Sequence, residues 1–205
     1  MNMDFEKTLA DEGTSKTEIK KSKFYGLAYP VSSRERVNEI LDRVRKQFAD
    51  STHIVYAYRI GIGGADEYFT DAGEPSGTAG AQIIRILKGR SISNAIIIVV
   101  RYFGGIKLGM GGLARAYGDA ARLAIENAVT IPLVKMLVVH AIIPYGAVSK
   151  WAIFVDSHNG TLLSQKFGKE VEIEASLPES AIAEAGELIM EITHGKRELE
   201  IVKTN

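Results

Sequence analysis

The hydrophobic and polar residues of this chain follow strand and helix periodicities in turn. Short runs rich in β-branched and aromatic residues, typical of strands, alternate with stretches whose apolar residues recur at helical spacing. In the first 130 residues these patterns predict strands over 14–20, 24–31, 52–60, 67–70 and 94–101. Helices are predicted over 34–48, capped by Ser32 or Ser33, and over 79–87 and 111–129. The first 13 residues are expected to be a partly ordered lead-in.

A second pattern begins after Thr130-Ile131-Pro132, which we interpret as a domain boundary. Beyond it the chain predicts strand, helix, strand, strand, helix and strand in order, over 135–143, 145–157, 161–167, 170–177, 178–194 and 198–202. This β-α-β-β-α-β order is the ferredoxin-like arrangement. The expected fold class is therefore α/β (α+β), with an N-terminal domain over 1–132 and a ferredoxin-like domain over 133–205.

The composition is typical of a globular protein, and the charge differs slightly between the two parts of the chain. The 205 residues are 46% hydrophobic and 24% charged, with a net charge of zero. Residues 1–134 carry 18 Lys and Arg against 15 Asp and Glu, so +3, and residues 135–205 carry 7 against 10, so −3. There is no cysteine, the first residues are acidic rather than a signal peptide, and no apolar run could span a bilayer. We expect a cytoplasmic protein with no membrane contact.

Glycine is concentrated between residues 71 and 117, in two clusters on either side of the apolar run 96–100. Glycine permits positive φ and close backbone approach, and helix starts offer unpaired N–H groups to anions. Basic side chains sit beside both clusters, at Arg85, Arg101, Lys107 and Arg115. Two glycine-rich loops, each leading into a helix, therefore predict a surface that receives anions, with nucleic-acid phosphate as the favoured ligand.

The first loop, DAGEPSGTAG, has more than one interpretation. Ser76, Gly77 and Thr78 would bind a phosphate through hydroxyl and backbone N–H groups. Asp71 and Glu74 would instead hold a cation, or act as acid and base in an enzyme. In a purely structural interpretation the segment is a turn, Thr78 caps the next helix, and the acids pair with Arg101 or Arg85.

The second loop, RYFGGIKLGMGG, supplies Arg101, Gly104, Gly105 and Lys107 as candidate ligand-binding residues. Exposed aromatic residues next to Arg101 would stack on bases. The loop has no Walker A spacing and matches G-x-G-x-x-A only loosely, so no cofactor is predicted. The four histidines, scattered without ligand spacing, predict no metal site: His53, His140, His158 and His194.

The segments DAGEPSGTAG (71–80) and VVRYFGGIKLGMGGLARAY (99–117) together resemble the signature of the YigZ/IMPACT family. The resemblance covers about residues 15–130, and the C-terminal half resembles the smaller domain of bacterial members. The family's usual DGEPSGTAG is interrupted here by Ala72. The resemblance implies an N-terminal βαβ fold like that of ribosomal proteins and domain four of elongation factor G. It also implies a role in translation regulation for eukaryotic members, and nucleic-acid or ribosome binding for bacterial ones.

These observations favour a binding protein over an enzyme. Its expected partners are RNA, the ribosome or translation factors, contacted through the glycine-rich loops with Ser76, Thr78, Arg101, Lys107 and Arg115. Two alternatives stay open: an enzyme acting on a small phosphorylated or peptidic substrate at the Asp71/Glu74 loop, and a module that binds another protein.

Overall fold

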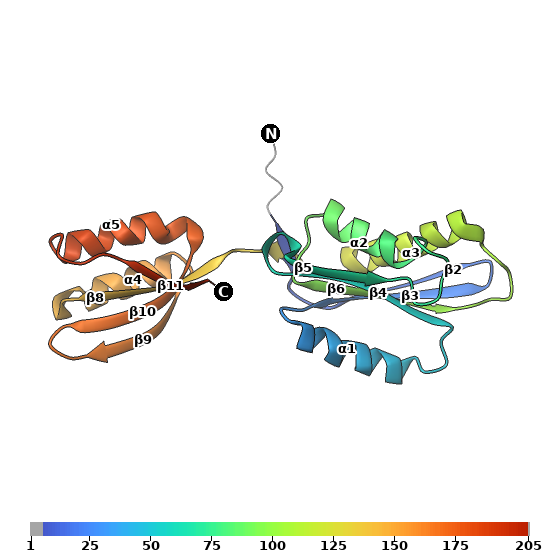
Figure 1. Cartoon of the computed structure of the whole chain (residues 1–205), viewed down its shortest axis with the longest axis horizontal. Helices are drawn as coiled ribbons and strands as arrows, with labels where there is room; N and C mark the ends of the chain where they lie inside the picture. The colour runs from blue at the N-terminus through green and yellow to red at the C-terminus, as the bar shows by residue number, and fades with distance from the viewer. Residues whose placement is uncertain (1–5, 205) are drawn as a thin grey trace. The chain divides into compact units, whose positions relative to one another are not determined.

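A computed structural model describes residues 6–204. The chain divides into two compact units, Met1–Leu133 and Val134–Asn205. Each unit has a sheet and a hydrophobic core of its own (Figure 1).

The first unit is built on a five-stranded sheet in which every neighbouring pair is antiparallel. The spatial order of its strands is β2 (Gly13–Ile19), β3 (Ser22–Pro30), β6 (Ala95–Tyr102), β4 (His53–Ile60) and β5 (Asp66–Thr70). The central strand is β6, and its residues 95–101 are all buried. The apolar run near residue 98 thus forms a strand covered on both faces, as its sequence predicts.

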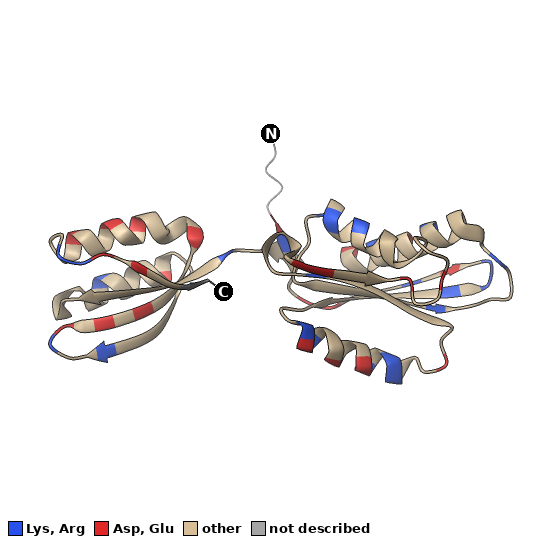
Figure 2. Ribbon diagram, viewed as in Figure 1, with Lys and Arg blue, Asp and Glu red and all other residues tan. Residues whose placement is uncertain are grey.

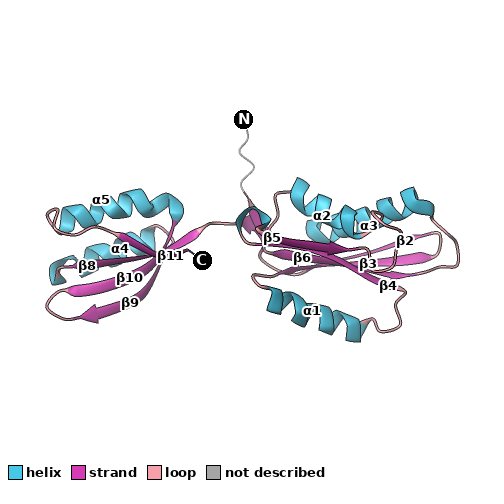
Figure 3. Ribbon diagram, viewed as in Figure 1, coloured by secondary structure: helices cyan, strands magenta, loops and turns pink. Residues whose placement is uncertain are grey.

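Helices cover both faces of this sheet (Figure 3). On one face lies α1 (Arg34–Gln47), whose buried stripe packs against alternate residues of β3 and β6. On the other lie α2 (Gly80–Gly89) and α3 (Gly109–Glu126), which pack against the intervening residues. Period-two alternation along the strands divides the core into these two clusters.

The start and outer face of α1 follow the predicted pattern. The Ser33 hydroxyl caps the helix by accepting a hydrogen bond from the Arg36 N–H. Basic and acidic residues are interspersed along α1 (Figure 2), and exposed ion pairs such as Arg36–Glu39 form at i,i+3. Such exposed pairs are each worth less than about 1 kcal/mol, so this face is a solvated surface.

The ends of the first unit pair with each other, which corrects the expected lead-in. Strand β1 (Lys7–Leu9) pairs antiparallel with β7 (Thr130–Pro132). The Leu133 N–H also donates to the Glu6 carbonyl at 2.8 Å. Residues 6–13 therefore belong to the folded unit, and the segment interpreted as a boundary is itself a short strand. Residues 1–5 lie outside the described part of the chain.

The second unit has the predicted β-α-β-β-α-β order. Its main elements are β8 (Met136–Ile143), α4 (Val148–Ser157), β9 (Thr161–Phe167), β10 (Val171–Pro178), α5 (Ile182–Ile192) and β11 (Glu200–Thr204). The sheet order β11-β8-β10-β9 is antiparallel throughout. Trp151 is fully buried in the core between sheet and helices. This is the ferredoxin-like arrangement that the sequence predicts.

Element bounds differ from prediction by a few residues, mainly at helix starts. Short 3₁₀ turns (Tyr145–Ala147 and Glu179–Ala181) precede α4 and α5, and a third, Ile62–Gly64, lies between β4 and β5. Helix α3 begins at Gly109, two residues earlier than predicted, and ends at Glu126. Terminal turns depend on local hydrogen bonds that apolar spacing does not encode.

Candidate functional site

The two glycine-rich loops meet at one end of the sheet of the first unit. Arg101, near the end of β6, is paired in register with His53, the first residue of β4. The loop before α2 contacts this end through Glu74, and the loop before α3 continues directly from β6. Strand pairing and the loop before α2 therefore bring together residues 53, 74 and 101, which are far apart in sequence.

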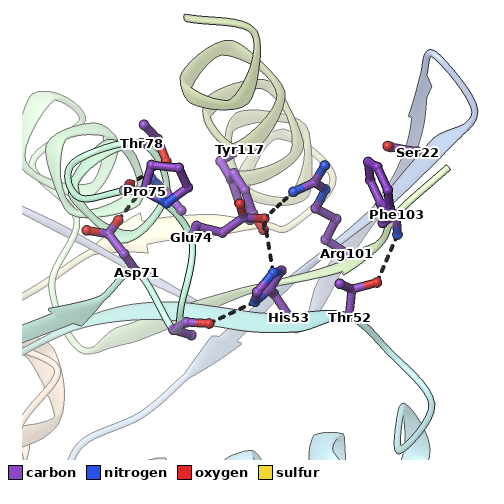
Figure 4. Close-up of polar contacts among 12 residues, drawn as sticks. Ser22, Thr52, His53, Asp71, Glu74, Pro75, Thr78, Arg101, Phe103 and Tyr117 are labelled. Atoms are coloured by element: carbon purple, nitrogen blue, oxygen red, sulfur yellow. Dashed lines mark hydrogen bonds and ion pairs between the residues drawn. The ribbon is translucent and has the colours of Figure 1, made fainter. Parts of the chain in front are cut away.

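A buried ion pair joins the two loops (Figure 4). The Arg101 Nη1 donates to Glu74 Oε1 at 2.5 Å, and the two side chains are only 7% and 3% exposed. The Arg101 guanidinium also lies 5.3 Å from the Phe103 ring centre and 5.6 Å from that of Phe24. Arg101, a candidate ligand-binding residue, is thus held inside the unit, because the Glu74 carboxylate neutralises it there.

Two further polar side chains complete this cluster. The Tyr117 hydroxyl, from α3, donates to Glu74 Oε1 at 2.7 Å. Burial, and then this hydrogen bond to Glu74, raise the pKa of Tyr117 well above its ordinary value, so Tyr117 remains a neutral donor. His53 Nε2 lies 3.9 Å from Glu74 Oε1, and its Nδ1 lies 2.9 Å from the Ala72 carbonyl oxygen.

The contact with Ala72 determines the tautomer of neutral His53. A carbonyl oxygen only accepts hydrogen bonds, so the proton of neutral His53 sits on Nδ1. Nε2 then offers a lone pair on the side of Glu74. The cluster formed by His53, Glu74, Arg101 and Tyr117, hereafter the buried polar cluster, therefore combines a carboxylate, a guanidinium, a neutral phenol and an imidazole acceptor.

A pocket of about 460 Å³ opens beside the buried polar cluster. The rest of its lining comes largely from the second loop and the start of α3. The lining residues are Thr52, His53, Glu74, Pro75, Arg101, Phe103, Lys107, Leu108, Gly109, Met110 and Leu113. Both loops thus contribute to one concave site with mainly apolar walls and a few polar groups, as is usual for ligand pockets.

The first loop does not present the predicted phosphate-binding groups. The Asp71 carboxylate accepts hydrogen bonds from the N–H groups of Gly77, Ala79 and Gly80 at 2.8–3.0 Å. Asp71 therefore occupies the position an external anion would take at the start of α2. This contact also replaces the predicted Thr78 cap.

Other groups of the first loop are also engaged or lie apart from the pocket. Thr78 is buried, and its hydroxyl donates to the Pro75 carbonyl at 2.6 Å. Ser76 is exposed but does not line the pocket. Among the predicted residues of this loop, Glu74 alone lies at the pocket, while Asp71 has a structural role.

Gly104 and Gly105 determine the path of the second loop. A side chain at Gly104 would place its Cβ 2.0 Å from the Lys21 carbonyl carbon, so only glycine fits against that turn. The Gly104 N–H donates to the Ser22 hydroxyl at 3.1 Å. Gly105 has a φ of +83°, which other residues rarely adopt. These two residues direct the loop so that Phe103 is left 46% exposed beside the pocket.

The start of α3 differs from that of α2, where the Asp71 carboxylate accepts hydrogen bonds from the first N–H groups. Its N-cap, Leu108, makes no side-chain hydrogen bond, and its first turn contains no acidic residue. Lys107 and Arg115 are exposed and form no ion pair with any residue among 6–202. Two cations and a positive helix end therefore face solvent here, as predicted for Lys107 and Arg115.

Sequence reasoning underestimated His53 and did not consider Tyr117 as a functional residue. Both reach Glu74 across long sequence separations, and neither belongs to a recognisable motif. The sequence did contain a signal for Tyr117. A tyrosine on an otherwise alanine-rich helix face suggests a specific hydrogen-bond partner for its hydroxyl. Elsewhere on α3, Arg122 forms surface ion pairs with Asp119 and Glu126.

Two other classes of site find no support in the described residues. No group of three or more His, Asp or Glu within residues 6–204 is arranged to hold a metal ion. None of the helices in that range is long and apolar enough to cross a bilayer.

Fold and site together define a mixed α/β protein of two units. The first unit has a pocket lined in part by the buried polar cluster. Residues 20–125 match the family described as the Impact N-terminal domain. The chain belongs to this IMPACT family.

Relatives share both units. The IMPACT family member YvyE of Bacillus subtilis is 31% identical over 193 residues, covering 94% of this chain and 89% of the relative. The IMPACT family member YigZ of Escherichia coli is 27% identical, covering 89% and 90%. A crystal structure of a hypothetical protein has a TM-score of 0.72 and 26% identity, with 98% of both chains covered. The similarity thus extends past the Impact domain into the second unit.

Proposed function

We propose that the first unit binds RNA of the translation machinery, and that the protein acts by binding rather than by catalysis. The binding surface consists of Phe103, Lys107, the first turn of α3 and Arg115, hereafter the α3 surface. One observation carries the proposal: two exposed cations without ion-pair partners among the described residues flank an uncapped helix start beside an exposed aromatic ring.

The chemistry of this surface is that of single-strand recognition. Cations and helix N–H groups attract phosphate, while an exposed ring stacks on a base of any sequence. The net charge of the chain is zero, so attraction comes from this local surface and not from the whole protein. The ribosome is the target that the family resemblance implies.

The proposal is tested by measuring RNA affinity against salt. A fluorescein-labelled single-stranded RNA is titrated with the full chain, and binding is followed by fluorescence anisotropy between about 50 and 300 mM KCl, a range over which phosphate contacts change affinity strongly. Each lost phosphate contact should lower the slope of log K against log salt by about 0.7. The double variant Lys107→Ala/Arg115→Ala should therefore lose about 1.4 units of slope.

The matched control removes two cations from α1, as Arg36→Ala/Lys46→Ala. Both residues are exposed on the same unit, away from the pocket. The control should keep the wild-type slope. Equal slopes for the two double variants, or no RNA binding at the lowest salt concentration, would refute the proposal.

Acid–base catalysis is a second candidate, favoured by the proximity of His53 Nε2 and Glu74 Oε1, 3.9 Å apart, at the floor of a pocket. An imidazole with its other nitrogen fixed by a carbonyl is arranged as a general base. Hydrolysis of p-nitrophenyl acetate and p-nitrophenyl phosphate by the wild type and His53→Gln tests this. Equal rates for both proteins would remove the candidate for these substrates.

A further inference from the structure

We propose that the pocket receives one unpaired base of the bound RNA, and that Glu74 accepts a hydrogen bond from an amino group of that base. This inference rests on the proposed function and specifies its ligand. The pocket adjoins the α3 surface directly, because Phe103 and Lys107 belong to both. Its volume of about 460 Å³ lies in the range of about 300–1,000 Å³ typical of small-molecule sites.

The walls suit a flat aromatic ligand. The apolar lining consists of Pro75, Phe103, Leu108, Met110 and Leu113. The Phe103 ring is 46% exposed and stands over the Arg101 guanidinium at 5.3 Å. Met110 is 63% exposed, and methionine adapts to flat π surfaces. A base entering here stacks on the ring and is covered by aliphatic side chains.

The floor of the pocket has hydrogen-bonding capacity that the protein leaves unused. The Glu74 contacts with Arg101, Tyr117 and His53 all involve Oε1, so Oε2 has no partner among residues 6–202. Neutral His53, with its proton on Nδ1, offers Nε2 as an acceptor. The Arg101 Nε is buried with no acceptor among the same residues. Two acceptors therefore lie at the floor of the pocket, whereas this Nε is buried too deeply for a ligand to reach.

This set of groups complements an amino-bearing base. Cytosine and adenine each present an exocyclic amino group, whose two N–H donors match the two acceptors. The amino group donates to Glu74 Oε2, as carboxylates accept from the N4 amine of cytosine. Uracil has a carbonyl oxygen in place of the amine, and that oxygen would face the carboxylate. The pocket should therefore prefer cytosine and adenine over uracil.

The phosphate of the same nucleotide then lies at the rim, where Lys107 and the start of α3 provide positive charge. A peptide ending in an apolar residue would also combine an anion with an apolar body. Its side chain, however, would leave Glu74 Oε2 and His53 Nε2 without donors, and unpaired buried polar groups are unfavourable. The floor thus favours the base.

The experiment compares hexanucleotides of equal charge. Fluorescein-labelled C6, A6 and U6 RNA are titrated with the wild-type chain at a single salt concentration, about 100 mM KCl. Since their phosphates are the same, any difference comes from the bases. We expect C6 and A6 to bind at least about tenfold tighter than U6, the effect of one hydrogen bond to a charged group.

Two substitutions connect this preference to the pocket. Phe103→Ala should weaken all three complexes by about tenfold through lost stacking. Phe167→Ala, which removes a 61% exposed ring from the second unit, is the control and should change nothing. Glu74→Gln should abolish the preference for C6 and A6. If circular dichroism shows that this variant is unfolded, the wild-type preference and the Phe103→Ala result decide the question.

Three results would overturn the inference. Equal affinity for C6, A6 and U6, with the dependence on Lys107 and Arg115 intact, would refute the base pocket and leave the proposed function standing. Absence of binding to all three would refute both. Displacement of C6 by acetyl-Gly-Gly-Leu with a free carboxylate, but not by cytidine monophosphate, would assign the pocket to peptide ends.

Discussion

Breaking the Glu74–Arg101 pair should strongly destabilise the first unit. Both side chains are nearly buried, so neither partner can recover hydration when the other is removed. Arg101→Met leaves the carboxylate with only the Tyr117 hydroxyl as a direct donor. Glu74→Gln leaves a buried guanidinium facing a neutral amide. Removing one member of a buried pair typically costs about 3–5 kcal/mol.

The double variant Glu74→Gln/Arg101→Met should be much less affected than the two single variants suggest. It contains no unpaired buried charge, and the amide oxygen introduced at position 74 still accepts from the Tyr117 hydroxyl. Replacement of a whole buried pair is often close to neutral. The two sites should therefore show a coupling energy of several kcal/mol, instead of the additivity expected of independent sites.

Urea unfolding of the full chain measures this effect unit by unit. The single tryptophan, Trp151, lies in the core of the second unit, so its fluorescence follows that unit. Near-ultraviolet circular dichroism of the tyrosines, all but Tyr145 in the first unit, follows the other. With a denaturant dependence of about 2 kcal/mol per molar urea, a loss of about 4 kcal/mol lowers the first midpoint by about 2 M. The tryptophan transition is the internal control.

Two outcomes would contradict this reasoning. Losses below about 1 kcal/mol for both single variants would mean that water compensates for the missing partner, as it does for exposed ion pairs. Additive losses in the double variant would mean that the charges are independently stabilised. In either case the Glu74–Arg101 contact would contribute no more to stability than an exposed ion pair does.

Three further predictions concern other contacts of the same unit. Because the pKa of Tyr117 is raised in the folded state, its stabilising effect is complete below its ordinary value of 10.0 and is lost as the pH rises above it. The free energy of unfolding should therefore fall above that pH more steeply in wild type than in Tyr117→Phe, by up to about 1.4 kcal/mol per pH unit; parallel curves would contradict this. Asp71→Ala removes an acceptor for three N–H groups and should cost about 1–2 kcal/mol in urea unfolding, whereas a neutral effect would mean that water caps α2 equally well. Gly104→Ala should cost about 1–3 kcal/mol through overlap with the Lys21 backbone, while Gly111→Ala, with no atom within 4 Å of the added Cβ, should be neutral or stabilising. Equal melting temperatures for the two glycine variants would refute the steric argument.

The sequence predicted the sheet core and most helices because those elements bury a periodic apolar surface. The run around Ile98 has no polar interruption and appears as the central strand. Strands β1 and β7 were missed for the opposite reason. Each has three residues, too few to show a period, and the partners lie far apart along the chain.

The candidate site was predicted only in part. Lys107 and Arg115 are exposed as expected, because long cations without a nearby acid remain in solvent. The sequence allowed Arg101 either to face a ligand or to pair with an acid, and the structure shows that it pairs with Glu74. The conformation of the turn between residues 71 and 80 determines that Glu74 pairs with Arg101 and that Asp71 caps α2. That turn includes Ala72 at a φ of +47°, which spacing rules do not anticipate.

The pairing of β1 with β7 brings the two ends of the first unit to one place. Residues 6 and 133 are joined by a direct backbone hydrogen bond, so the chain enters and leaves this fold through adjacent points. Such a module can be inserted into, or fused within, a longer polypeptide without stretching its sheet. A circular permutant that joins these ends and opens the chain at the exposed Ala49, in the turn between α1 and β4, should accordingly still fold.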